Sequence, residues 1–87
     1  MKSWSKQLKR LVRFIVEVKS GSYPNASTFC QKLEHIDTLQ NTNLSCSVKT
    51  IKRDIDYLKN QMNAPLEYDP AEHGYYLYIP DWTFPEL

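Results

Sequence analysis

The sequence predicts a mainly α-helical domain with a small β-hairpin at its C-terminal end. Three segments repeat apolar residues at helical spacing, and two short tyrosine-containing runs follow them on either side of a loop with proline and glycine. A chain of 87 residues holds one hydrophobic core and has no room for a second. Three helices followed by a two-stranded wing are the order of a winged helix-turn-helix, which we assign to residues 1–80.

The first predicted helix lies in a basic N-terminal segment. Its apolar side chains recur at helical spacing and are Leu8, Leu11, Val12, Phe14, Ile15 and Val18. Ser3 or Ser5 can cap the start of this helix, and Gly21 fits its end. Pro24 then blocks continuation of the helix, and we expect it to hold Tyr23 in an extended conformation.

A second helix is predicted to begin at Asn25 or Ser27, because both residue types are favourable N-caps. Its apolar face consists of Ala26, Phe29, Cys30, Leu33 and Ile36. The helical pattern weakens over residues 37–40, and residues 41–45 carry the polar side chains that favour loops. We therefore expect a long connection over residues 34–45 before the next helix.

The third predicted helix follows Ser47, which is a typical N-cap residue. One arc of roughly 80° holds its apolar side chains, at about 100° per residue. They are Val48, Ile51, Ile55, Leu58 and Met62. The opposite side carries Lys49, Arg53 and Asn60, flanked by Thr50, Asp56 and Tyr57. The Asn-Ala-Pro sequence at residues 63–65 ends the helix.

Residues 66–68 and 75–79 are rich in strand-favouring side chains and predict the hairpin. We expect it to cover the core with Leu66, Tyr68, Tyr76 and Tyr78. Its loop has Glu72 and His73 at the tip, and the hairpin contains no Lys or Arg, so we do not expect the wing to bind phosphate. Residues 81–87 are predicted to form an aromatic tail or linker towards a downstream domain or a partner.

The net charge of +1 conceals an uneven distribution of charge along the chain. Residues 1–19 hold six basic side chains and one acidic, whereas residues 65–87 hold five acidic side chains and no basic ones. A polyanion would therefore be attracted to the N-terminal two thirds of the chain and repelled by the C-terminal third.

Several functional classes are not expected from this sequence. Gly21 and Gly74 are the only glycines, so there is no glycine-rich phosphate loop, and no arrangement typical of a catalytic triad is present. We therefore expect neither an enzyme nor a cofactor. Cys30 and Cys46 are expected to be small buried hydrophobes in a reducing cytoplasm rather than a disulfide or zinc site. No apolar run is long enough to cross a membrane, and no secretory signal is recognisable.

Five stretches resemble a known family: residues 21–26 (GSYPNA), 47–55 (SVKTIKRDI), 64–69 (APLEYD), 74–76 (GYY) and 84–85 (FP). In this order they resemble the N-terminal winged helix-turn-helix of the bacterial WYL-domain transcriptional regulators, a branch of the DeoR-like repressors. The resemblance implies a module that reads an operator and is followed by a ligand-sensing domain. The long connection over residues 34–45 departs from the family, and the sensing domain is not in this chain.

The third helix carries the candidate DNA-binding residues, which are Ser47, Lys49, Thr50, Lys52, Arg53 and Tyr57. Lys49 and Arg53 lie one turn apart and can reach phosphates or a guanine edge, although helical charges are often merely solvated. Thr50 can contact a base, and Ser47 caps the helix, whose free N–H groups can bind phosphate. Tyr57 can hold a phosphate through its hydroxyl or simply pack. The expected partner is double-stranded DNA.

Other charged and aromatic residues admit two interpretations each. We expect Asp54 to form a structural ion pair or cap, and Asp56 to pair with Lys52 or Lys59. The basic residues of the first helix either widen the phosphate footprint or form a solvated surface. Tyr78, Trp82 and Phe84 are candidate contacts with a dimer or other partner. Trp82 and Phe84 would be the exposed aromatics of the tail, or would pack back on the domain.

A two-fold homodimer would present two recognition helices to an inverted repeat. The alternative function is a winged-helix module for protein interaction or dimerisation that does not bind DNA, which the acidic wing favours.

Overall fold

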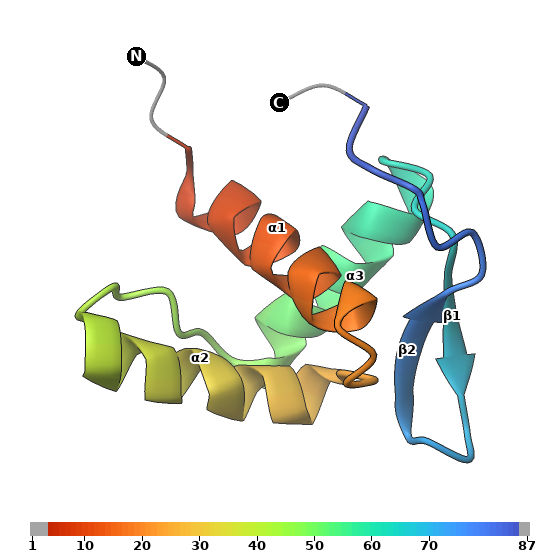
Figure 1. Ribbon diagram of the computed structural model, residues 1–87. Coiled ribbons are helices and arrows are strands. Elements are labelled where there is room, and N and C mark those ends of the chain that lie inside the picture. Colours follow the sequence, from red (N-terminus) through yellow and green to blue (C-terminus); the bar gives the residue numbers. More distant parts are fainter. Residues whose placement is uncertain (1–3, 86–87) are drawn as a thin grey trace.

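The computed structural model describes residues 4–85 as three helices followed by an antiparallel hairpin (Figure 1). This is a winged-helix layout, so the predicted fold class is confirmed. Residues 1–3 of the predicted domain, including the alternative cap Ser3, and residues 86–87 of the predicted tail lie outside the described residues. The elements are α1 (Lys6–Lys19), α2 (Ala26–Gln40), α3 (Val48–Asn60), β1 (Leu66–Asp69) and β2 (Gly74–Leu77).

The three helices enclose one core, and the hairpin closes one side of it. Figure 1 shows α1 crossing in front of α3, with α2 beneath them and the hairpin beside the end of α1. Phe14 and Phe29 meet edge to face at the centre, with ring centroids 5.1 Å apart. The largest fully buried side chains are Phe14, Phe29, Leu33, Ile51 and Leu58. Burial of these side chains fixes which side of each helix faces inward.

The ends of α1 follow the expected capping chemistry. The Ser5 hydroxyl accepts a hydrogen bond from the Leu8 backbone N–H at 3.1 Å, so Ser5 is the N-cap. Gly21 has φ +81° just beyond the helix, in the left-handed region where glycine avoids Cβ strain.

The prediction that Tyr23 is extended was wrong, since its φ is +51°. The reason is a tertiary contact. The turn places the Pro24 carbonyl oxygen where it accepts a hydrogen bond of 2.9 Å from the Tyr75 backbone N–H. The Tyr23 carbonyl also passes so close to Gly74 that a Cβ there would lie 1.7 Å from the Tyr23 oxygen. Glycine at position 74 is therefore what allows the hairpin to approach this turn.

Asn25 caps α2 and also connects α2 to the wing. Its side chain accepts the Thr28 backbone N–H at 2.8 Å, while the Thr28 hydroxyl accepts the Asn25 N–H at 2.9 Å. The same amide donates to the His73 carbonyl at 2.7 Å, which ties the hairpin loop to the start of α2.

The expected long connection after α2 is mostly helix, so that prediction was wrong. α2 continues to Gln40 and ends at Asn41, whose left-handed φ of 56° terminates it. The loop that remains before α3 is held by Asp37, whose carboxylate accepts hydrogen bonds from Thr42 Oγ1, Leu44 N and Ser45 N at 2.6–2.7 Å. These donors stabilise the charged carboxylate and hold the pKa of Asp37 well below its usual range.

α3 packs with Ile51, Ile55 and Leu58 buried, as predicted from their spacing. The two outer members of the predicted apolar arc are less enclosed. Val48 is 36% exposed at the first turn, and Met62 lies beyond the end of the helix and is half-buried. The helix thus uses three well-buried aliphatic side chains to fix its orientation.

A buried ion pair joins α1 to α3. Arg10 Nε lies 2.7 Å from Asp54 Oδ2, and the two side chains are 12% and 8% exposed. Gln7 Nε2 donates a weaker hydrogen bond to Asp54 Oδ1 at 3.5 Å. The expected structural role of Asp54 is confirmed, and the hydrogen bond with its carboxylate raises the pKa of Arg10. Arg10 therefore points into the domain and does not widen the basic surface of α1.

The hairpin faces the core with a different set of residues from the set predicted. Leu66 pairs with Leu77 and both are buried, while Tyr75 packs half-buried against the core. The Tyr76 hydroxyl instead donates to Glu67 Oε2 at 3.1 Å, and Tyr68 and Tyr78 are 44% and 60% exposed. The prediction that Tyr68, Tyr76 and Tyr78 cover the core was therefore wrong.

Side chains along β2 alternate between the two faces of the hairpin, and Tyr75 and Leu77 are the ones that face the core. They take the core positions that were assigned to Tyr76 and Tyr78. Tyr68 lies opposite Tyr75, with the two rings 5.3 Å apart.

Substituting Asp54 with alanine is expected to lower the free energy of unfolding by about 3 kcal/mol, because it leaves the Arg10 guanidinium buried without its partner. Urea denaturation followed by circular dichroism measures this. The matched control is Asp56→Ala on the exposed side of the same helix, which should change stability by no more than about 0.5 kcal/mol. Equal unfolding midpoints and slopes for the two variants would contradict the proposed role of the ion pair.

Substituting Asp37 with asparagine is expected to remove a pH-dependent contribution to stability. A carboxylate whose pKa is lowered in the folded state stabilises fully above its unfolded pKa of about 3.9, and this stabilisation is lost as the pH falls below that value. The melting temperature of the native chain should exceed that of Asp37→Asn at neutral pH, and the gap should narrow progressively below about pH 4. A gap of constant size from pH 7 to pH 2 would argue against this assignment.

Candidate nucleic-acid interface

The solvent-facing side of α3 presents a row of polar side chains, which we call the α3 face. It consists of Lys49, Lys52, Arg53, Asp56 and Tyr57, all exposed, and Tyr57 is 41% exposed. This side is opposite to Ile51 and Leu58, whose burial holds it outward. The structure therefore brings four of the predicted DNA-binding residues together on one accessible surface.

The other two predicted residues, Ser47 and Thr50, form the start of the helix. The Ser47 hydroxyl accepts the Thr50 backbone N–H at 3.2 Å and lies 3.1 Å from the Thr50 hydroxyl. Ser47 is therefore the N-cap, as predicted, and the half-buried Thr50 side chain belongs to the same cap. Both side chains therefore stabilise the start of α3. The Ser47 side chain is also exposed to solvent.

The cationic groups of the α3 face are not neutralised by neighbouring acids. Among residues 4–85, Lys49, Lys52 and Arg53 have no carboxylate oxygen within 4.0 Å. Asp56 forms no ion pair within the described residues either, so its predicted pairing with Lys52 or Lys59 is wrong. Exposed charged side chains lose rotamer entropy when they form an ion pair, and the Coulomb energy they gain is small because water screens the charges. This accounts for the absence of ion pairs on this surface.

A groove of about 450 Å³ runs along one side of the α3 face, between α3, the first turn of α2 and the hairpin. Val48, Ala26 and Ile55 contribute apolar surface to this groove. Its polar and aromatic lining consists of Asn25, Ser27, Lys52, Asp56, Tyr68 and Tyr75. Burial raises the pKa of Tyr75. Its hydroxyl, like that of an ordinary tyrosine, is protonated at neutral pH and can donate a hydrogen bond.

Sequence reasoning missed the contributions of α2 and the hairpin to this groove. Asn25 and Ser27 were recognised only as caps, and Tyr75 was assigned no role. The groove exists because three separate elements converge, which no periodicity within one segment reports. The one signal in the sequence was the alternation of side chains along the second strand, which places Tyr75 and Tyr76 on opposite faces of the hairpin.

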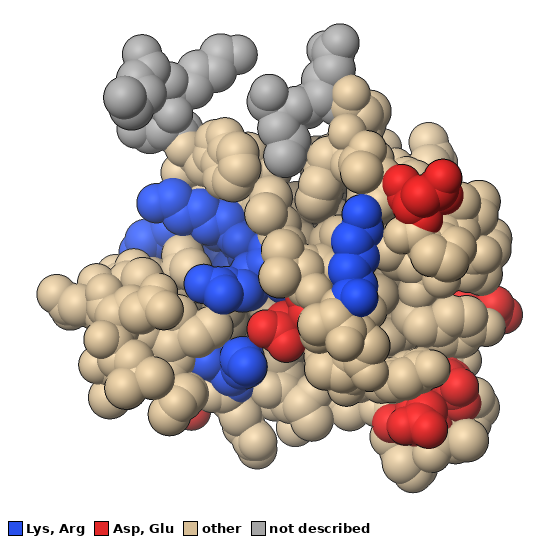
Figure 2. Space-filling model, viewed as in Figure 1, with Lys and Arg blue, Asp and Glu red and all other residues tan. Residues whose placement is uncertain are grey.

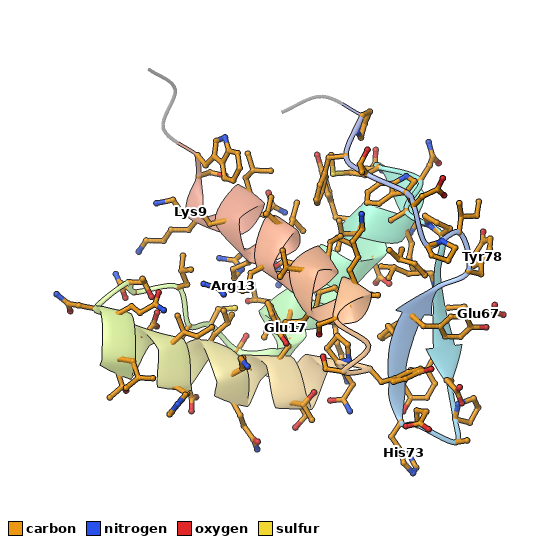
Figure 3. All side chains as sticks on the ribbon, in the orientation of Figure 1. Lys9, Arg13, Glu17, Glu67, His73 and Tyr78 are labelled. Atoms are coloured by element: carbon orange, nitrogen blue, oxygen red, sulfur yellow. The ribbon has the colours of Figure 1, made fainter. Side chains whose placement is uncertain are left out.

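Basic and acidic side chains occupy different parts of the molecule. Figure 2 shows most of the basic groups over the α1 side, with one acidic group among them, and most of the acidic groups on the hairpin side. In Figure 3, Lys9 and Arg13 project from α1, whereas Glu67, His73 and Tyr78 lie on the hairpin side. The uneven charge of the sequence therefore persists in space, and the wing is the part least suited to approach a polyanion.

The three predicted partner-contact residues do not form one exposed surface. Tyr78 is 60% exposed and its neighbour Ile79 is 49% exposed. Trp82 and Phe84 instead are half-buried against the core, with ring centroids 5.2 Å apart. Of the two interpretations given for Trp82 and Phe84, packing back on the domain is confirmed and exposure on the tail is wrong, because the core offers apolar surface that they can cover. Tyr78 remains available to a partner.

The cysteines have structural surroundings. Cys30 is buried and Cys46 half-buried, both are free thiols, and Cys30 Sγ donates to the Cys46 carbonyl at 3.1 Å. Burial raises the pKa of the Cys46 thiol, which disfavours the reactive thiolate. Within residues 4–85 no three His, Cys, Asp or Glu side chains come together as metal ligands. No helix in the same range has the length and apolar character needed to cross a membrane.

Comparison of the chain with protein-family models, with curated proteins and with solved structures finds no match. The resemblance of residues 47–55 and of the hairpin to WYL-domain regulators therefore stays an expectation from the sequence. Function must be inferred from the geometry and charge of the α3 face and the groove beside it.

Proposed function

We propose that the chain binds double-stranded DNA in a sequence-specific manner, as the operator-reading module of a cytoplasmic transcriptional repressor. The observation that carries this proposal is the α3 face: Lys49, Lys52 and Arg53 are exposed on a capped helix whose other side is fixed in the core, and they have no ion-pair partner among residues 4–85. Unpaired cations on a protruding helix suit the major groove, which admits an α-helix and is lined by phosphates.

The roles of the individual residues follow from their chemistry. Arg53, near the middle of α3, can pair bidentately with guanine O6 and N7, and Lys49, one turn earlier, can reach a phosphate or a base. Tyr57, a turn beyond Arg53, is exposed, and its hydroxyl can donate to a phosphate. Ser47 acts through the helix start, whose backbone N–H groups attract phosphate.

The groove beside α3 supports the same orientation on DNA. Lys52, Asn25 and Ser27 line it, and their side chains can donate to a sugar-phosphate strand. Asp56 also lines the groove, so we propose that the phosphates lie against these donors and not against its carboxylate. The wing contributes hydroxyl groups from Tyr68 and Tyr75 in place of the basic side chains that many wings carry. We therefore propose that affinity comes from α3 and the start of α2, and that the acidic hairpin loop stays clear of the duplex.

We further propose that the module acts as a homodimer on an inverted repeat, with Tyr78 among the contacts between copies. Tyr78 and Ile79 form a small exposed apolar surface at the end of β2, and aromatic side chains are enriched in interface cores. In a longer protein the same surface would adjoin the sensing domain that the resemblance implies.

A second candidate function is a protein-interaction module without DNA binding. It is favoured by the exposed Tyr78 and Ile79 and by the acidic wing, on which Glu67 is exposed. The two functions use different surfaces, so substitutions on the α3 face discriminate between them.

Substituting Arg53 with alanine should weaken binding to a selected operator by about 1–3 kcal/mol if Arg53 reads a base, with a smaller effect on unrelated duplexes. Substituting Lys49 with alanine should weaken all duplexes similarly and reduce the salt slope by about one if Lys49 contacts a phosphate. Fluorescence anisotropy titrations over a range of salt concentrations measure both effects.

The matched control is Lys19→Ala, which removes an exposed positive charge at the end of α1, away from the α3 face. It should leave the preference for the operator unchanged. If neither α3 variant alters DNA affinity beyond this control, the DNA-binding proposal is wrong and the interaction module becomes the better candidate.

A further inference from the structure

Asp56 is the one acidic residue on the α3 face, and nothing in the described part of the chain explains it structurally. Its side chain is exposed and makes no hydrogen bond or ion pair with any residue from 4 to 85. Asp54, two positions earlier, is buried and paired with Arg10. The two acids of α3 thus have opposite surroundings, and only Asp54 has a role in holding the fold.

The position of Asp56 on the helix places it among the cations. Lys49, Arg53, Asp56 and Asn60 follow one another at intervals of four, three and four residues, so they form one stripe along the exposed side of α3. Asp56 also lines the groove beside α3. A carboxylate at this place repels phosphates, so it opposes the nonspecific part of DNA binding.

We infer that Asp56 is a specificity residue that selects cytosine in the major groove; this inference rests on the proposed DNA-binding function. A carboxylate only accepts hydrogen bonds, and cytosine presents the N4 amino donor at its major-groove edge. Guanine offers two acceptors, and thymine offers an acceptor beside a methyl group. Adenine has an N6 donor, but its N7 acceptor lies beside that donor and repels a carboxylate.

The spacing of Arg53 and Asp56 suits neighbouring base pairs. Three residues advance about 4.5 Å along a helix axis, which is close to the rise of about 3.4 Å between base pairs. Arg53 on a guanine and Asp56 on a cytosine one step away would then each meet a base edge with complementary hydrogen-bonding groups. The carboxylate is the component that rejects guanine and thymine at its position.

Selection of binding sites from a pool of random duplexes tests this inference with the full chain. The native protein should enrich sites with cytosine at one fixed position of each half-site, next to a guanine. Asp56→Asn should shift that position to adenine, because an amide pairs with adenine N6 and N7. Asp56→Ala should reduce the preference for cytosine at that position about tenfold, while the preference for guanine at the neighbouring position is retained.

The matched control is Glu34→Gln, which neutralises an exposed carboxylate on α2 away from the α3 face and should select the same sites as the native chain. Circular dichroism confirms that each variant is folded. Identical sites for the native chain and both Asp56 variants would overturn the inference and leave DNA binding intact. A native chain that enriches no sequence would overturn the proposed function and the inference together.

Discussion

The ion pair between Arg10 and Asp54 is the constraint that fixes how α3 is rotated in the domain. Asp54 lies on the side of α3 that faces α1, and a buried carboxylate cannot leave its guanidinium partner without a large desolvation penalty. Apolar packing by Ile51 and Leu58 alone would tolerate small rotations, because aliphatic contacts are not directional. With the ion pair added, the exposed stripe from Lys49 to Asn60 has one orientation.

Two further sets of contacts hold the elements on either side of this helix. Asp37 ties down the loop that enters α3, so that the Ser47 cap is presented at a fixed place. On the other side, Asn25 holds the His73 carbonyl, and Gly74 allows close approach to Tyr23. These contacts keep the hairpin against the start of α2, which creates the groove beside α3. A preorganised surface of this kind loses little conformational entropy on binding.

Local chemistry was readable from the sequence, whereas contacts between elements were not. The Ser47 cap, the buried side of α3 and the fold class follow from residue spacing and side-chain type. The partner of Asp54 could not be named, because Arg10 is 44 residues away and only packing brings it near. The extension of α2 to Gln40 was missed because its polar last turn is supported by Asp37 and the loop rather than by an apolar pattern.

Alternation in β2 could have corrected the assignment of Tyr76 and Tyr78, but it needs one buried position as a reference, which packing supplies.

The central claim is that the α3 face and the groove beside it, and not the acidic hairpin loop or the surface at Tyr78 and Ile79, meet DNA. The most direct measurement is a titration of the isotopically labelled chain with a short duplex at low ionic strength, following every backbone amide by NMR. We expect the largest shift changes at residues 49–57 and at the start of α2, with little change at Tyr78 and Ile79. Changes confined to Tyr78 and Ile79, or no changes at any duplex concentration, would contradict this account.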